Sequence, residues 1–89
     1  MTDLIRRVEL AARRHGARRV TLVRLRLGAL VQVSPDHLRE HFAEAARGTL
    51  AEGCGVEIEV LDDVGGQYAQ DVVLDSIEIE DDGVEGATR

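Results

Sequence analysis

Residues 20–27, which read Val-Thr-Leu-Val-Arg-Leu-Arg-Leu, decide how the rest of this 89-residue chain is arranged. Their β-branched and aliphatic side chains favour a strand. In the second half of the run, apolar residues alternate with arginines, so the two kinds lie on opposite faces. The apolar face carries Val23, Leu25 and Leu27, and the other face carries Arg24 and Arg26. A strand with this pattern needs a hydrophobic layer on one side only.

The segment before this strand is predicted to be an amphipathic helix. Thr2 or Asp3 can cap its first turn, and Gly16 fits the position just after its last turn. Apolar residues recur at helical spacing, and four arginines take the opposite side. The apolar set is Leu4, Ile5, Val8, Ala11 and Ala12, with His15 at the end, and the basic set is Arg6, Arg7, Arg13 and Arg14. His15 lies where a cation would interact favourably with the helix dipole.

A second amphipathic helix is predicted over residues 35–47. Ser34 can cap it, and Pro35 in the first position loses nothing by lacking an N–H. Gly48 closes this helix, and residues 49–52 have capping-box spacing, which predicts one further short turn. The apolar stripe of the helix consists of Leu38, Phe42, Ala45 and Ala46.

Two more strands are predicted in the last third of the chain. Residues 56–60 alternate strictly between apolar and acidic, as a strand with one wet face should. The final strand, at about residues 71–80, changes phase, and a β-bulge near Asp75 and Ser76 would turn both of its apolar pairs toward the core. Those pairs are Val72 with Leu74 and Ile77 with Ile79. Gly65-Gly66, between the two strands, fits a hairpin turn.

The sequence thus predicts an α/β two-layer fold with the order helix, strand, helix, strand, strand. Two helices would pack on one face of a three-stranded mixed sheet. The helix between the first two strands makes them parallel, and the hairpin makes the last strand antiparallel. Residues 1–80 form a single domain in this interpretation, and residues 81–89 form a polar, flexible tail.

Composition excludes several classes of protein. One cysteine leaves no internal disulfide and no CxxC pair for a structural zinc, and a reducing cytoplasm is the expected compartment. The apolar runs are too short to span a membrane, and we expect no membrane partner. Only 2% of the residues are aromatic and the arginines are scattered, so no nucleic-acid partner is expected. No catalytic triad, phosphate-binding loop or acid–base pair can be assembled, and we do not expect an enzyme.

Charge is divided unevenly along the chain, whose formal net charge is −6. Residues 1–47 carry ten arginines and five acids, whereas residues 48–89 carry one arginine and twelve acids. This division favours charge pairing within the fold or between copies, and a homo-oligomer is expected because a small sheet also leaves two edges. Arg24 and Arg26 are expected to form an ion-pair ladder with outward-facing acids, namely Glu57, Glu59, Glu78 and Glu80. The alternative is an acidic surface that attracts a basic partner or a divalent cation.

Three further residues are candidates for chemistry. His37 and His41 lie one helical turn apart, with Glu40 and Glu44 close by, and paired imidazoles at this spacing can chelate Ni²⁺ or Zn²⁺. The alternative is that both histidines are solvated residues beside the apolar stripe. Cys54 is interpreted as a small packed hydrophobe or a reactive thiol, or as one soft ligand in a site between two copies.

Several stretches, taken in order, resemble the HypA family of nickel metallochaperones, which help mature nickel–iron hydrogenases and in some bacteria urease. The stretches are residues 15–20 (HGARRV), 23–30 (VRLRLGAL), 33–42 (VSPDHLREHF), 47–53 (RGTLAEG) and the closing 72–80 (VVLDSIEIE). The resemblance implies nickel at a Met-His-Glu start and zinc in a domain with two CxxC pairs between the last two strands. This chain instead reads Met1-Thr2-Asp3 and has residues 62–70 in place of the zinc domain, so we expect neither site and a shorter first helix.

The function implied is that of an accessory protein in nickel-enzyme maturation. It would dock on a maturation GTPase or a hydrogenase large subunit, and it would hold nickel weakly at His37 and His41 or with ligands shared with the partner. The alternative is a metal-independent adaptor or structural subunit that keeps the fold and has lost both metal sites.

Overall fold

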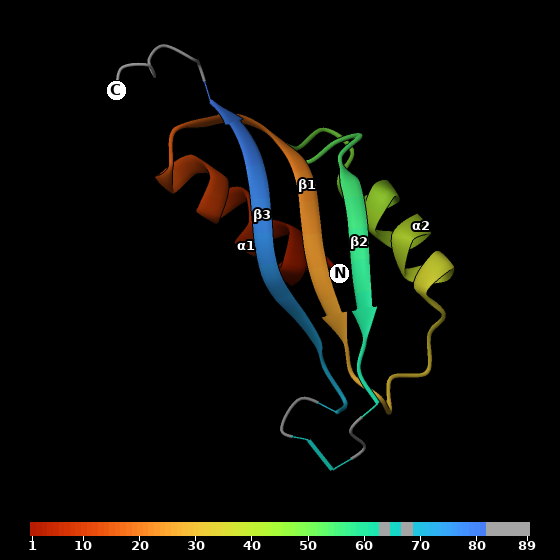
Figure 1. Ribbon diagram of the computed structural model, residues 1–89. Helices are drawn as coiled ribbons and strands as arrows, with labels where there is room; N and C mark the ends of the chain where they lie inside the picture. Colours follow the sequence, from red (N-terminus) through yellow and green to blue (C-terminus); the bar gives the residue numbers. More distant parts are fainter. Residues whose placement is uncertain (63–64, 67–68, 82–89) are drawn as a thin grey trace.

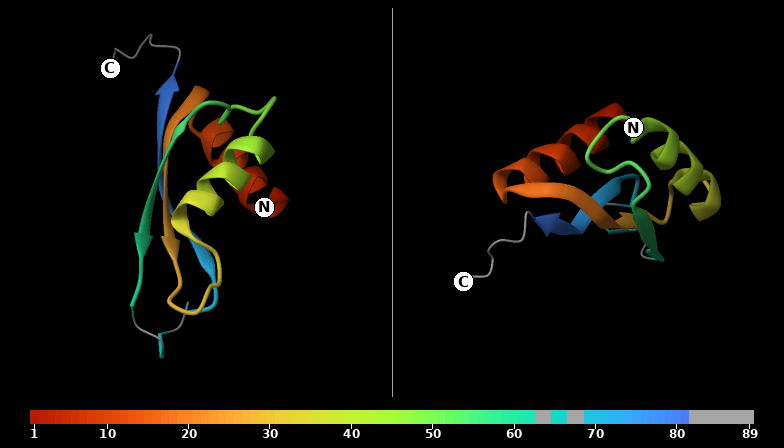
Figure 2. Two further views of the ribbon diagram at one scale, coloured as in Figure 1. Left: turned by 90° about the vertical axis from the view of Figure 1, so that its right-hand side faces the viewer. Right: turned by 90° about the horizontal axis from the view of Figure 1, so that it is seen from above.

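The computed structural model describes residues 1–62, 65–66 and 69–81 and shows two layers. The elements are α1 (Thr2–Arg14), β1 (Ala17–Leu27), α2 (Pro35–Ala45), β2 (Gly55–Val60) and β3 (Val72–Asp81). Both helices cover one face of the three-stranded sheet, and the opposite face is open (Figures 1 and 2). The predicted α/β two-layer fold and its element order are therefore confirmed.

The ends of the elements follow local chemistry. Ser34 caps α2, since its Oγ accepts a hydrogen bond from the backbone N–H of His37 at 3.1 Å. The start of α1 differs from the prediction, because Met1 occupies the N-cap position and no side chain caps this helix. Gly16 ends α1 with a φ of 69°, a conformation that glycine adopts without the steric cost of a Cβ. The helix α2 is two residues shorter than predicted.

β1 is the central strand of the sheet, whose order is β2-β1-β3. It pairs parallel to β2 and antiparallel to β3. These directions were predicted, but the pairing of β1 with β3 was not. The hairpin predicted at Gly65-Gly66 is wrong, because β2 and β3 are not neighbours. The segment before β3 instead lies beside the segment after β1, where Gly28 N–H donates to the carbonyl of Asp71 at 2.8 Å and Leu30 N–H to that of Ala69 at 2.7 Å. The link between the last two strands therefore passes the end of β1.

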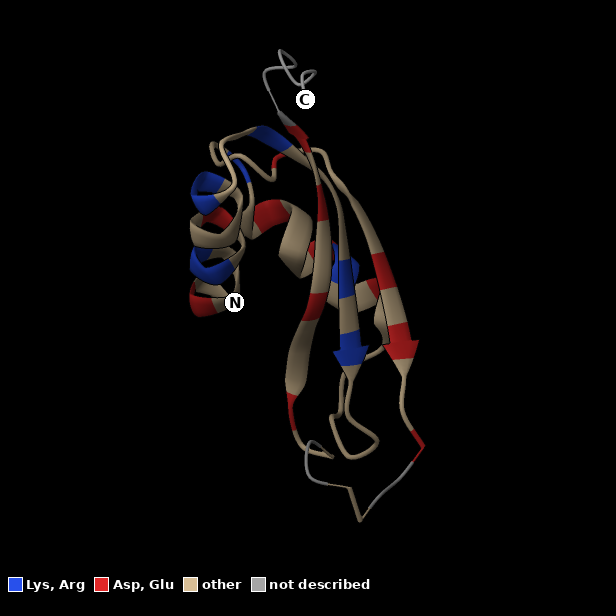
Figure 3. Ribbon diagram, turned by 60° about the vertical axis from the view of Figure 1, so that its left-hand side comes forward, with Lys and Arg blue, Asp and Glu red and all other residues tan. Residues whose placement is uncertain are grey.

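The charges explain why β3 does not pair with β2. Both outer strands carry carboxylates on the open face of the sheet, and like charges directly opposite each other destabilise a strand pair. With β1 between them, each acidic strand faces the arginines of β1 (Figure 3). This order converts a repulsive pairing into two attractive ones.

The bulge predicted in β3 is confirmed. Ser76 lies opposite Arg24, whereas Leu74 lies opposite the next residue of β1, Leu25, so Asp75 is the extra residue. The bulge lets both predicted apolar pairs of β3 pack against the core, namely Val72 with Leu74 and Ile77 with Ile79.

A second irregularity, in β1, was not predicted. Val20 lies opposite Ile79 and Leu22 lies opposite Glu78, which leaves Thr21 as an extra residue. Val20 consequently faces the core although it is three residues from Val23, and it is only 2% exposed.

The hydrophobic core lies between the two helices and the sheet. The helices contribute one face each, and β1 contributes Val20 in addition to the residues predicted from its alternation. The buried side chains are Ile5, Val8 and Ala12 of α1, Leu38 and Phe42 of α2, Val20, Val23, Leu25 and Leu27 of β1, and Ala46 and Ala51 of the turns after α2. His15, placed at the end of the apolar face by its spacing, is exposed.

No helix among the described residues is long and apolar enough to cross a membrane. The predicted tail begins at Asp81, which is instead the last residue of β3. The rest of that tail lies outside the described residues.

Candidate functional site

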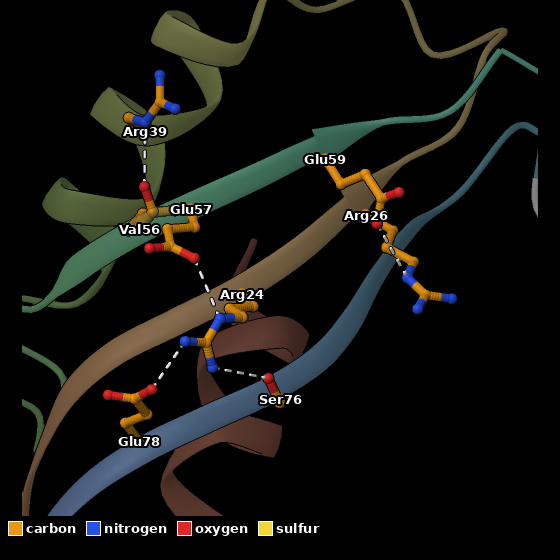
Figure 4. Close-up of polar contacts among 8 residues, drawn as sticks. All are labelled: Arg24, Arg26, Arg39, Val56, Glu57, Glu59, Ser76 and Glu78. Atoms are coloured by element: carbon orange, nitrogen blue, oxygen red, sulfur yellow. Dashed lines mark hydrogen bonds and ion pairs between the residues drawn. The ribbon is translucent and has the colours of Figure 1, made fainter.

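The open face of the sheet carries an ion-pair ladder centred on β1 (Figure 4). Arg24 bridges all three strands, since its Nε lies 3.1 Å from a carboxylate oxygen of Glu57 on β2 and its Nη2 lies 2.7 Å from one of Glu78 on β3. The hydrogen bond to Glu78, followed by the one to Glu57, raises the pKa of Arg24 above its ordinary value. These two contacts of Arg24 link both edge strands to the central strand.

Arg26 continues the ladder one step along β1. Its guanidinium lies 3.5 Å from Glu59 on β2 and 3.3 Å from Asp75, the bulge residue of β3. Asp75 was not among the predicted members, because only the register of the bulge brings it within reach. Glu80 was a predicted member of the ladder with Arg24 and Arg26. It pairs with Arg19 at 2.6 Å, since the register places these two residues opposite each other. The carboxylates of this face are thus matched by arginines, which favours the ladder over the cation-binding alternative.

Another arginine holds α2 against the edge of the sheet. The Nε of Arg39 donates to the carbonyl of Val56 at 3.1 Å, and its Nη1 donates to Asp36 at 2.9 Å. Figure 4 shows the Val56 carbonyl pointing away from β1 toward this helix. A side chain thus covers part of an exposed strand edge, a common protection against pairing with other chains.

The predicted histidine pair lies on the exposed side of α2. The rings of His37 and His41 stack, with centroids 4.5 Å apart and an interplanar angle of 20°. They line a shallow hollow of about 180 Å³ together with Glu40 and Glu44. Within the described ranges, no group of three or more histidine, cysteine or acidic residues is arranged to hold a metal ion. The lone pair of an imidazole nitrogen lies in the plane of its ring, so two rings stacked nearly parallel do not both point at one ion and must turn to share a metal.

Cys54 lies in the turn before β2, half-buried against the core. Its N–H donates to the carbonyl of Ala51 at 3.1 Å. Burial raises the pKa of the Cys54 thiol above its ordinary value. These observations favour the packed-hydrophobe interpretation, because a reactive cysteine needs a stabilised thiolate.

The raised pKa predicts slow alkylation of Cys54. At neutral pH the folded protein should react with iodoacetamide several-fold more slowly than the protein unfolded in urea, because less thiolate is present and access is restricted. The rate should rise as the pH increases through the alkaline range, where the thiol loses its proton. Mass spectrometry over time measures both rates. Equal rates for folded and unfolded protein at neutral pH would show that Cys54 is a reactive surface thiol.

The sequence matches known proteins over most of the described elements. A family model described as "Hydrogenase/urease nickel incorporation, metallochaperone, hypA" matches residues 1–65. A hydrogenase maturation factor HypA from Desulfitobacterium hafniense is 36% identical over 61 residues, which cover 68% of this chain and 54% of that protein. The factor of the same name from Archaeoglobus fulgidus is 42% identical over 57 residues (64% and 52%), and the one from Escherichia coli K12 is 42% identical over 52 residues (58% and 45%). The chain therefore spans about half the length of these curated relatives.

Proposed function

Because this chain belongs to the HypA family, we propose that it is an accessory protein in the maturation of nickel enzymes, foremost nickel–iron hydrogenases. The family match over residues 1–65 carries the proposal, since that range includes α1, β1, α2 and β2. The protein would act in the cytoplasm by docking on a maturation GTPase or a hydrogenase large subunit, without catalysing a reaction itself. A homo-oligomer built through the strand edges stays a prediction.

We propose that nickel, the cargo, is held weakly by His37 and His41. Neutral imidazole nitrogens suit late transition metals, and the two rings project from the same side of α2. Two ligands from one helix leave most coordination positions to water, to Glu40 or Glu44, or to ligands of the partner. Such an incomplete site favours transfer of the ion over storage.

The residues of this chain cannot form the zinc domain that the family resemblance implies between the last two strands. Residues 61–71 are all that separate β2 from β3, and the single cysteine, Cys54, precedes β2. A zinc site built from two CxxC pairs needs four thiolates. This observation favours the second candidate function, a metal-independent adaptor that retains the docking surfaces of the fold.

Calorimetric titration of nickel into the tag-free protein tests the first candidate. We expect binding in the micromolar range that is lost when His37 and His41 are both replaced by alanine. The one histidine left, His15, cannot chelate the ion by itself. His15→Ala is the matched control, since it removes an exposed histidine outside α2 and should leave binding unchanged. Binding that survives the double substitution would rule out these ligands. No binding by the wild-type protein would leave the adaptor function.

A further inference from the structure

The outer side of α1 presents one exposed leucine inside a ring of arginines. The side chain of Leu10 is 54% exposed, which makes it one of the most exposed large apolar residues among those described. Positions three and four residues away are its neighbours on a helix surface. All four of these positions hold exposed arginines: Arg6, Arg7, Arg13 and Arg14.

Among the residues that the structure describes, the fold makes no use of this surface. The helix buries its opposite side, with Ile5, Val8 and Ala12 in the core. Figure 3 shows the basic segments of α1 on the side that faces away from the sheet. Neither the sheet nor α2 covers Leu10, so the packing of the described part of the chain does not explain its exposure or the ring around it.

The arginines of the ring also lack the acidic partners that other arginines of this protein have. Arg13 has one distant ion pair, to Glu9 at 3.7 Å, and no ion pair joins Arg6, Arg7 or Arg14 to an acid in the part of the chain that the structure describes. Arg24 and Arg26 of β1, in contrast, each contact two carboxylates. Several like charges on one helix face are destabilising unless something neutralises them.

We propose that this surface of α1, the Leu10 ring, docks on an acidic surface of a partner protein. Leu10 would enter an apolar recess, and the four guanidinium groups would form charge-assisted hydrogen bonds with carboxylates around it. A central apolar anchor surrounded by polar contacts is the usual arrangement of an interface hot spot. The inference rests on the proposed function, which requires a docking surface, and it assigns that surface to α1 rather than to the self-neutralised open face of the sheet.

The chemistry favours an acidic protein over the other polyanionic partners. The net charge of −6 disfavours a nucleic acid, and one leucine gives little apolar area for a membrane. A second copy of this chain is disfavoured because most carboxylates of its open face already pair with arginines.

Binding of the full chain to a purified maturation GTPase and to a purified hydrogenase large subunit, measured by biolayer interferometry, tests the proposal. Leu10→Asp and the double substitution Arg6→Glu/Arg13→Glu should each weaken the interaction at least about tenfold, and added salt should weaken wild-type binding. Leu30→Asp and Arg47→Glu are matched controls, because each changes an exposed residue of the same type outside α1 and should have less than a twofold effect. Circular dichroism confirms that the variants fold. Wild-type affinity in the α1 variants would overturn the inference and leave the proposed function intact.

A second measurement keeps the inference testable if neither partner binds, a result that would count against the proposed docking function. Poly-L-glutamate is titrated into labelled protein at low salt and followed by NMR. Amide shifts confined to residues 6–14, and absent in Arg6→Glu/Arg13→Glu, would support the Leu10 ring as a surface for acidic polypeptides, whereas no shifts or shifts elsewhere would overturn it. Tighter binding of a DNA duplex than of poly-L-glutamate would overturn the choice of a protein partner. If the protein associated with itself and Leu10→Asp abolished this association, the partner of the Leu10 ring would be a second copy of the chain, and the choice of an acidic partner protein would be overturned.

Discussion

Replacing Phe42 with alanine is expected to destabilise the fold by about 3–5 kcal/mol, as truncation of a buried aromatic side chain does. Phe42 is 1% exposed and heads the fully buried side chains by volume. It attaches α2 to the core in a domain whose net stability is expected to be only about 5–10 kcal/mol. Urea unfolding followed by circular dichroism measures the loss as a lower midpoint with an unchanged slope.

Leu30→Ala provides the comparison for this experiment. Leu30 is 46% exposed, and its truncation should change the free energy of unfolding by no more than about 0.5 kcal/mol. Phe42→Leu, which retains most of the apolar volume, should fall between the two. A loss below about 1 kcal/mol for Phe42→Ala would contradict the packing described for α2, because the cavity would then cost nothing.

Deleting Glu78 is expected to destabilise the protein by about 2 kcal/mol or more, because a one-residue shift in β3 turns either Ile77 or Ile79 away from the core. Both isoleucines pack against the core from the helix-facing side of β3. The deletion also removes the carboxylate that Arg24 contacts at 2.7 Å. Thermal unfolding, with near-native far-ultraviolet circular dichroism below the transition, measures the effect.

Deleting Asp75 is the matched control, since it removes one acid from the same strand. Asp75 is the extra residue of the bulge, so its loss leaves Leu74 and Ser76 in the regular alternation that their partners on β1 require. The protein should therefore keep its fold and most of its stability, although Arg26 loses one partner. If the two deletions were equally harmful, the bulge would not be what sets the two phases of β3.

Sequence alone predicted those features that depend on local patterns. The phase change between Leu74 and Ile77 revealed the bulge, because a strand with one buried face cannot change phase without an extra residue. The alternation in β1 placed Arg24 and Arg26 on the open face, and the ladder followed from the acids of the last two strands. The histidines of α2 were brought together by their spacing, which fixes proximity on a helix but not the rotamers that decide between stacking and chelation.

The features that were missed depend on long-range register. A short link containing two glycines suggests a hairpin, and nothing local to Gly65-Gly66 shows that the next strand passes to the far side of β1. The signal was present in the charges: two arginines on one strand and acids on the two others are best matched when the basic strand lies in the middle. Val20 was missed for the same reason, because the extra residue Thr21 is visible only against its partner strand.

The separation of β2 from β3 also affects which changes of length the fold can accept. The two strands exchange no ladder hydrogen bonds, so the sheet places no demand on the tightness of the link that joins them. The β3 end of that link is fastened independently by the contacts of Ala69 and Asp71 with the segment after β1. Since lengthening a loop costs free energy only logarithmically, a whole module could be gained or lost between residue 62 and residue 69 without rebuilding the scaffold. Insertions or deletions at this one junction can therefore change the domain composition of the protein while the two helices and the sheet are retained.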